Sequence, residues 1–189
     1  MKDLKPAVVL FLALTVVCGG LYPAAVTLVA GVAFPLQAAG SFVKDAAGRE
    51  TGSALIGQPF TDPEYFWPRP SATAPFAYNP GSSGGANLGP TNPALLAAVA
   101  DRVGALRVAG IEGPVPSDLV LASASGLDPH VTPAGARAQL ARVARARGIP
   151  EAELERLVVS RVEDRQFGIL GEPRVNVLQL NLALDRLSR

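Results

Sequence analysis

The chain has 189 residues, of which 49% are hydrophobic and 17% are charged, less than the usual quarter. From Lys44 onward the basic and acidic residues balance at 15 each, which argues against nucleic-acid binding because such surfaces are usually basic. One cysteine, Cys18, and one histidine, His130, exclude an intrachain disulfide and argue against a metal centre built from Cys and His.

The N-terminal segment is apolar and uncharged. No charged residue occurs in the 38 positions between Lys5 and Lys44, and residues 6–34 are almost all apolar or small. About 20 such residues suffice to cross a bilayer, so residues 1–36 are predicted to be a short N-terminus and a transmembrane helix. The alternative is a cleaved signal peptide, or one lipidated at Cys18. The apolar run is longer than the roughly 7–15 residues of a signal peptide, which favours a retained span.

Charge predicts the orientation of this span. Lys2 and Lys5 precede it, and positive flanks stay in the cytoplasm. We therefore expect a single-pass protein of a bacterial inner membrane. Residues 37–52 would be a connector leaving the membrane, and residues 53–189 a soluble domain outside the cytoplasm.

Small residues and one proline mark the middle of the predicted span. Pro23 lacks an N–H and should kink or loosen the turn before it. Gly20 and Ala24 form a small-xxx-small pair, which lets another helix approach closely. They are candidate contacts for a partner helix, although such composition is also ordinary in membrane spans.

The first part of the soluble domain has few signs of regular structure. Residues 53–58 are short and apolar, which predicts a buried strand. Residues 59–93 are rich in Pro, Gly, Ser and Asn, so they cannot form a regular helix or a central strand. They also hold six aromatic residues, which predicts an ordered loop rather than a flexible linker. Four of its side chains are candidate partner contacts, since such types dominate interface hot spots: Tyr65, Phe66, Trp67 and Arg69. Packing of the loop on its own domain is the alternative.

Three helices with clear start signals are predicted next. The first begins with Asn92 as its cap and ends at Gly110, the second begins at Thr132 and ends at Gly148, and the third opens at Pro150. Their apolar positions predict one inward face each, at Leu95, Leu96, Val99, Val103 and Leu106, at Leu140, Val143 and Ala144, and at Leu154, Leu157 and Val158. The second helix also has a basic side, predicted to be solvated or to meet an acidic partner: Arg137, Arg142, Arg145 and Arg147.

Two further segments are ambiguous. Residues 118–125 indicate a strand or a buried turn around Leu119 and Val120. Residues 175–187 alternate as a strand would, yet their last part suits a helix, which we favour. Together these elements predict an α+β class: one N-terminal transmembrane helix followed by a single mixed soluble domain with a long ordered loop rich in Pro, Gly and aromatic residues.

The sequence contains no clear catalytic motif. A Gly-x-x-x-x-Gly-Lys-[Ser/Thr] phosphate-binding loop is absent, and Ser-Gly-Gly at 83–85 is interpreted as a turn. Ser125, Asp128 and His130 would need to be hydrogen-bonded in series to act as a hydrolase, and Asp-Pro at 128–129 favours a turn instead. We therefore predict no catalytic residue, no cofactor and no metal.

Several long motifs make a family recognisable. They are Gly-Ser-Ala-Leu-Ile-Gly-Gln at 52–58, Tyr-Phe-Trp-Pro-Arg-Pro-Ser-Ala-Thr at 65–73, Ser-Gly-Gly-Ala-Asn-Leu-Gly-Pro-Thr-Asn-Pro at 83–93, Ala-Ser-Ala-Ser-Gly-Leu-Asp-Pro-His-Val-Thr-Pro at 122–133, and Val-Asn-Val-Leu-Gln-Leu-Asn-Leu-Ala-Leu-Asp at 175–185. In this order, after one N-terminal span, they resemble the C subunit of the Kdp-type potassium-transporting P-type ATPase. The resemblance covers nearly the whole chain.

The resemblance implies a set of partners and a role. The partners are a channel-like potassium-binding subunit, a P-type ATP-hydrolysing subunit and a small F peptide. The C subunit is a non-catalytic accessory needed for assembly and activity of high-affinity potassium import. It is described as capping the outer entrance of the channel-like subunit and as raising the ATP affinity of the ATP-hydrolysing subunit. Direct contact with ATP would involve Gln139 or residues 83–85. A membrane-tethered hydrolase or binding domain unrelated to transport is the alternative function.

Overall fold

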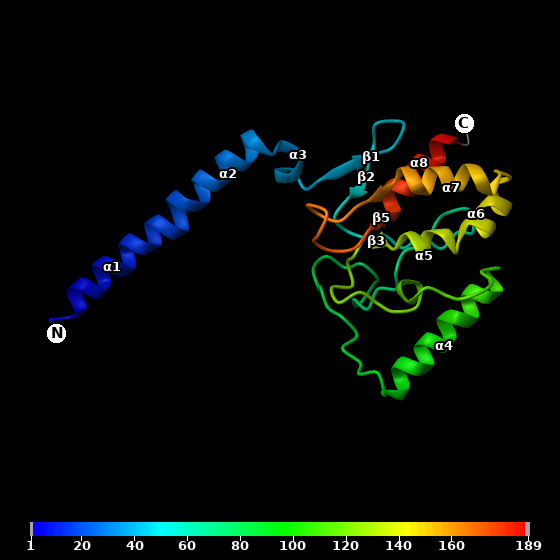
Figure 1. Ribbon diagram of the computed structural model, residues 1–189. Helices are drawn as coiled ribbons and strands as arrows, with labels where there is room; N and C mark the ends of the chain where they lie inside the picture. Colours follow the sequence, from blue (N-terminus) through cyan, green and yellow to red (C-terminus); the bar gives the residue numbers. More distant parts are fainter. Residues whose placement is uncertain (1, 188–189) are drawn as a thin grey trace. The chain divides into compact units, whose positions relative to one another are not determined.

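The computed structural model describes residues 2–187 and contains two compact units, Met1–Phe42 and Val43–Arg189. Figure 1 shows a long N-terminal helix in the first unit and a mixture of helices and strands in the second. The α+β class with one N-terminal apolar helix is confirmed. The division after Phe42 falls inside the predicted connector.

The N-terminal unit is one continuous apolar helix. It runs through α1 (Leu4–Val16), a π-helical turn (Val17–Leu21) and α2 (Tyr22–Ala33). The helix is 30 residues long, and its most apolar 18-residue stretch has a mean hydropathy of 2.1 and is not buried at all. At 1.5 Å per residue the helix is about 45 Å long, which exceeds the roughly 30 Å hydrocarbon core. By length and composition it can cross a membrane.

The loosened turn predicted from Pro23 is present. The π-helical turn Val17–Leu21 lies directly before α2, and the N–H of Tyr22 donates to the carbonyl of Val17, five residues back. Pro23 has no N–H to donate, and its ring pushes away the carbonyl to which a residue at this position would otherwise bond. The helical hydrogen bonds therefore span one more residue at this point. A short helix, α3 (Pro35–Ala38), follows.

Two small sheets lie in the second part of the chain. Strands β1 (Phe42–Lys44) and β2 (Glu50–Ser53) form a two-stranded sheet. A three-stranded antiparallel sheet has the order β3-β5-β4, so the last strand of the chain is central. Its strands are β3 (His130–Val131), β4 (Val162–Glu163) and β5 (Arg174–Asn176). In this sheet Val175 faces both Val131 and Val162, and its side chain is completely buried.

Capping residues start the helices where the sequence predicts. The Asn92 side chain accepts a hydrogen bond from the N–H of Ala94 (2.9 Å), and Thr132 accepts one from the N–H of Gly135 (2.9 Å). Gly148 ends its helix with φ of +66°, a left-handed conformation that costs a side-chain-bearing residue more. The helices are α4 (Pro93–Val108), α5 (Pro133–Arg137), α6 (Leu140–Arg147), α7 (Glu151–Ser160) and α8 (Val177–Leu187). The predicted second helix is thus two helices, α5 and α6.

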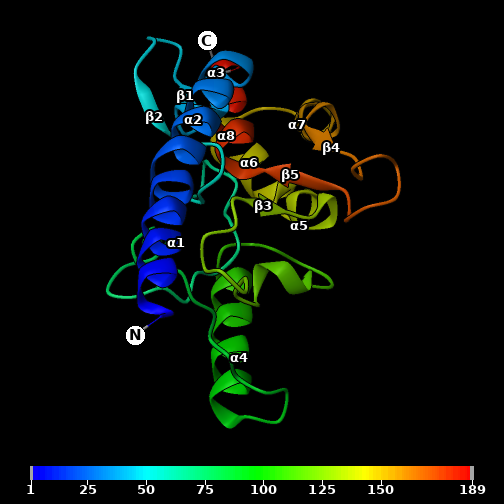
Figure 2. The same cartoon turned by 90° about the vertical axis from the view of Figure 1, so that its left-hand side faces the viewer.

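The core forms around α7, which packs against α5, α6 and α8, while α5 and α8 also pack against β5. Figures 1 and 2 show these elements together, with α4 at the lower edge of the domain. Helix α8 contributes most, because Leu180 and Leu184 are completely buried. The helical interpretation of the tail is therefore confirmed, with β5 supplying its first residues.

Some expectations were wrong. Residues 54–58 form a turn and an irregular segment rather than a strand, because the Ala54 carbonyl accepts its hydrogen bond from the Asn176 side chain (2.8 Å) rather than from a neighbouring strand. Leu96, predicted to face inward, is 60% exposed, and Leu106 is the one buried residue of α4 among those described. Residues 118–125 adopt the buried turn, with Leu119 and Val120 in the core.

Candidate functional site

The loop of residues 59–92 carries four of the candidate contact residues, and its aromatic segment is held by two buried side-chain amides. Asn181 on α8 accepts from the N–H of Phe66 (2.9 Å) and donates to the carbonyl of the same residue (3.0 Å). Gln139, between α5 and α6, does the same for Trp67: its oxygen accepts from the N–H (2.7 Å) and its nitrogen donates to the carbonyl (3.0 Å). Both amides are almost completely buried. The two amides thus satisfy backbone N–H and carbonyl groups that, in a regular sheet, a neighbouring strand would satisfy.

Two arginines of α6 stack on the aromatic rings of this loop. The Arg142 guanidinium lies 3.9 Å from the centre of the Trp67 ring, and that of Arg147 lies 4.7 Å from the centre of the Tyr65 ring. Arg142 also donates to the Pro63 carbonyl (2.6 Å) and to Gln139 (2.7 Å). Burial lowers the pKa of Arg142 to about 10, which still leaves it charged at neutral pH.

The basic side of the second predicted helix is therefore not simply a solvated face. Arg142 is 4% exposed, Arg147 pairs with Asp185 (2.8 Å), and Arg137 pairs with Glu155 (2.8 Å). Arg137 and Arg145 are the exposed members of the set. The planar guanidinium groups of Arg142 and Arg147 lie on aromatic rings that precede them by roughly 75 residues in the sequence. The periodicity of a single helix cannot predict such a contact.

The four candidate contact residues of the loop differ in how far their side chains are buried. Phe66 is completely buried, so it fixes the loop to the core and presents no surface to a partner in this structure. Tyr65, Trp67 and Arg69 are only partly buried. The packing of the loop on its own domain, which the sequence left as an alternative, is what the structure has.

Arg69 lies in a second polar cluster, with Asp128 and His130. Its guanidinium pairs with one oxygen of Asp128 (3.0 Å), while the other oxygen accepts from the backbone N–H of His130 (3.0 Å) and lies 3.1 Å from its Nδ1. Burial alone would raise the pKa of Asp128, but the His130 hydrogen bonds and the Arg69 charge outweigh it and hold that pKa below its usual value. Ser125 is engaged elsewhere, since its hydroxyl accepts from the N–H of Leu127 (3.1 Å). In the described residues, no hydrogen bond joins it to His130.

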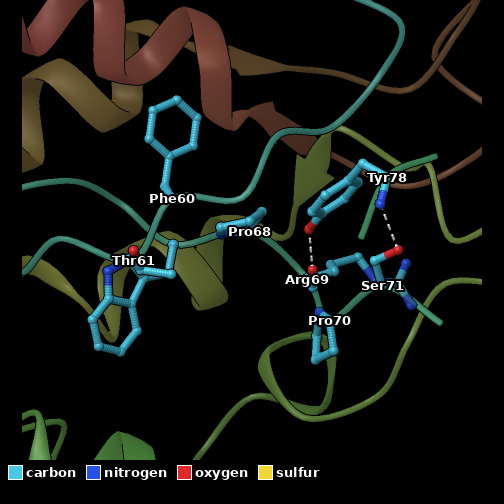
Figure 3. A pocket seen from close by; sticks show the side chains of 8 residues that line it. Phe60, Thr61, Pro68, Arg69, Pro70, Ser71 and Tyr78 are labelled. Atoms are coloured by element: carbon cyan, nitrogen blue, oxygen red, sulfur yellow. Dashed lines mark hydrogen bonds between the residues drawn. The ribbon is translucent and has the colours of Figure 1, made fainter. Parts of the chain in front are cut away.

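Tyr78 is buried beneath this part of the loop and holds it through hydrogen bonds. Its hydroxyl donates to the Arg69 carbonyl, and its N–H donates to the Ser71 hydroxyl (2.9 Å), as Figure 3 shows. Burial raises the pKa of Tyr78 well above its usual value. Only glycine fits at position 57, because a Cβ there would clash with the Tyr78 ring and lie 2.9 Å from the Asp128 carbonyl. The outer surface of this region is a shallow, mostly apolar hollow, lined by Phe60, Thr61, Trp67, Pro68, Arg69, Pro70, Ser71 and Tyr78.

The sequence candidates for nucleotide binding have structural roles. All the amide atoms of Gln139 are used inside the domain, and the residue is 0% exposed. In the 83–85 segment, the N–H of Gly84 donates to the Ser125 carbonyl (2.9 Å), and a Cβ at Gly85 would lie 2.8 Å from the Ala124 carbonyl. That segment is irregular and packs on its own domain, and the turn expected there lies just before it, at residues 79–82, where the N–H of Ser82 donates to the Asn79 carbonyl (3.1 Å).

Gly20 and Ala24 lie on the N-terminal helix, at the widened π turn and just after it. With Gly19, Leu21 and two residues of the preceding turn they line a shallow apolar groove on the helix surface. A Cβ at Gly20 would meet no atom within 4 Å, so the small residue is not required by the packing of the chain itself.

Comparison with known proteins identifies the family. The model of the family "KdpC: K+-transporting ATPase, c chain" matches residues 4–186. The potassium-transporting ATPase KdpC subunit of Geotalea uraniireducens is 62% identical over 189 residues, covering all of both chains. That of Geobacter sulfurreducens is 61% identical over 187 residues, covering 99% of both chains. This chain therefore belongs to the KdpC family of potassium-transporting ATPase C chains.

Proposed function

We propose that the chain is the non-catalytic, membrane-anchored accessory subunit of a high-affinity, ATP-driven potassium import complex. The observation that carries this proposal is the family match from residue 4 to residue 186, which includes both the apolar helix and the folded domain. The residues that could have served a catalytic or nucleotide site, Ser125 and Gln139, hold parts of the domain together instead.

The proposed location is the bacterial inner membrane, with the N-terminus in the cytoplasm and the domain outside. The positive charges of Lys2 and Lys5 before the apolar helix support this orientation. A reporter that is active only in the cytoplasm, fused to the C-terminus, should be inactive; an active reporter would contradict the orientation.

The proposed role is assembly of the complex and coverage of the outer entrance of the channel-like subunit. A domain outside the membrane does not reach cytoplasmic ATP, and Gln139 lies in the interior of that domain. Any rise in the ATP affinity of the P-type ATP-hydrolysing subunit would then be a coupling between distant sites. A small F peptide is the third proposed partner.

Two surfaces are proposed to make the contacts. Gly20 and Ala24 offer a groove where a partner helix could approach closely. The partly exposed Tyr65, Trp67 and Arg69 are proposed to face a partner outside the membrane. The stacking of Tyr65 and Trp67 on arginines of α6, and the pairing of Arg69 with Asp128, support this proposal. Rigid aromatic and arginine side chains lose little freedom on binding.

Growth under potassium limitation tests the function. Deleting the gene for this chain should abolish growth at low potassium but not at high potassium, and the gene on a plasmid should restore it. Unchanged growth of the deletion strain at low potassium, with no other importer expressed, would contradict the proposal.

A further inference from the structure

The segment between β4 and β5 exposes a cluster of large apolar side chains that the fold does not use. Phe167 is 90% exposed, Ile169 is 74% exposed and Leu170 is 53% exposed; together they are called the apolar tip. Figure 2 shows this orange loop projecting from the edge of the domain. Soluble domains scatter single apolar residues over their surfaces, but three large ones on one loop indicate an interaction site.

The apolar tip is held in one conformation by its backbone. Gln166 and Leu170 exchange two hydrogen bonds, N–H to carbonyl, of 2.9 Å each, and the N–H of Gly168 donates to the Arg165 carbonyl (3.1 Å). Phe167 has φ of +54°, a left-handed conformation that is uncommon for a bulky residue and that here keeps its ring out of the domain. A loop whose backbone is already fixed in place loses little backbone entropy when it binds.

Charge indicates what the apolar tip binds. Residues 166–171 carry no charge. At the base of the loop, Arg165 pairs with Glu172 (2.6 Å) and Arg174 pairs with Glu163 (3.0 Å), so both flanking arginines are already paired with carboxylates, and Asp164 adds a further negative charge. Loops that bind an anionic membrane surface usually carry unpaired Lys and Arg beside their apolar residues. An uncharged tip above a base without an unpaired arginine or lysine is instead complementary to an uncharged, apolar pocket of a protein.

We propose that the apolar tip inserts into an apolar pocket on another subunit of the potassium-transporting ATPase. This inference rests on the proposed function, because it takes the partner from the same complex. Phe167 would act as the anchor residue, with Ile169 and Leu170 closing the contact around it.

The first arm of the test compares two variants of the full chain. Phe167→Asn removes the ring while keeping a residue that tolerates the left-handed conformation, so the loop should stay folded. Val108→Asn is the matched control, since Val108 is 91% exposed but lies at the end of α4, outside the loop. Phe167→Asn should weaken co-purification of the other subunits roughly 10- to 100-fold, as loss of an anchor residue does. Val108→Asn should leave co-purification unchanged. Equal recovery with Phe167→Asn and wild type would overturn the inference.

The second arm identifies what covers the apolar tip. The sole cysteine, Cys18, is replaced by serine, Ile169→Cys is introduced, and labelling by a membrane-impermeant maleimide is measured. The inference requires rapid labelling of the chain alone, both in detergent and in vesicles of phosphatidylethanolamine and phosphatidylglycerol, and protection in the assembled complex. Protection in vesicles that hold no other subunit would indicate that lipid covers the tip. Protection in detergent that depends on protein concentration would indicate a second copy of the chain, and full labelling of the assembled complex would indicate no contact. Each of these results overturns the inference.

The two proposals can fail separately. A wild-type chain that recovers no ATPase subunit would contradict the proposed function and this inference together. A wild-type chain that recovers them, with Phe167→Asn recovering them equally well, would overturn only the role of the apolar tip.

Discussion

Replacing Gln139 by methionine should destabilise the domain by removing the hydrogen bonds that hold the aromatic loop. Methionine fills nearly the same volume, so the change removes polar contacts without opening a cavity. The N–H and the carbonyl of Trp67 would each lose their partner (2.7 and 3.0 Å). An unpaired, largely buried polar group costs roughly 1–3 kcal/mol, so the free energy of unfolding should fall by about 2–6 kcal/mol.

Urea unfolding of the full chain in detergent measures this loss. Trp67 is the only tryptophan, so its fluorescence reports the loop directly. With a urea dependence of about 2 kcal/mol per M, the midpoint should fall by about 1–3 M. Gln179→Met is the matched control: the Gln179 side chain is half-buried on α8, with no hydrogen bond to it found among residues 2–187. Its midpoint should not change.

The same variant distinguishes a structural glutamine from a nucleotide contact. In purified complex that still assembles, Gln139→Met should leave the KM for ATP unchanged. An unchanged urea midpoint together with a raised KM for ATP would refute the reasoning and restore direct nucleotide contact by Gln139.

Two further predictions concern the helix and the polar cluster. Gly20→Leu should fill the groove on the apolar helix and lower the recovery of partner subunits at least about tenfold. Ala25→Leu, which lies about 140° around the helix from Gly20, is the control and should leave recovery unchanged. Equal recovery with both variants would show that the groove is not a contact. The lowered pKa of Asp128 stabilises the folded state fully above its ordinary pKa of 3.8, and this contribution is lost as the pH falls through the lower, folded value. Asp128→Asn should therefore lower the urea midpoint at pH 6 and flatten its fall below pH 4, and parallel pH profiles for variant and wild type would contradict this.

Local signals in the sequence predicted much of the fold. Asn92, Thr132 and Gly148 act on their own neighbours, through a cap or a left-handed turn, so the helix ends they mark appear where expected. Pro23 likewise produced a widened turn within its own helix. Such effects depend on a few adjacent residues and need no knowledge of tertiary structure.

Contacts between distant segments could not be predicted in the same way. The pairing of Trp67 with Gln139 and the stacking of Arg142 on its ring join residues more than 70 positions apart. Helical periodicity assigns an arginine to the outside, although its planar group packs well on an aromatic face. Phe66 was a candidate contact because of its residue type in an aromatic segment, but its ring is buried and its N–H donates to the distant Asn181 side chain.

The apolar tip is a feature that sequence reasoning missed. Phe167, Ile169 and Leu170 resemble core residues by type, and the flanking glycines show only that a turn is near. Their exposure follows from the hairpin bonds between Gln166 and Leu170, which turn this short segment away from the sheet.

Affinity purification tests the central claim most directly. The chain would be tagged, its host starved of potassium, the membranes solubilised in mild detergent, and the eluate assayed for ATP hydrolysis with and without potassium. The account predicts that a channel-like subunit and a P-type ATP-hydrolysing subunit co-purify and that potassium stimulates their ATP hydrolysis. Elution of the chain alone, with no potassium-stimulated hydrolysis, would contradict its role as a subunit of a potassium-transporting ATPase.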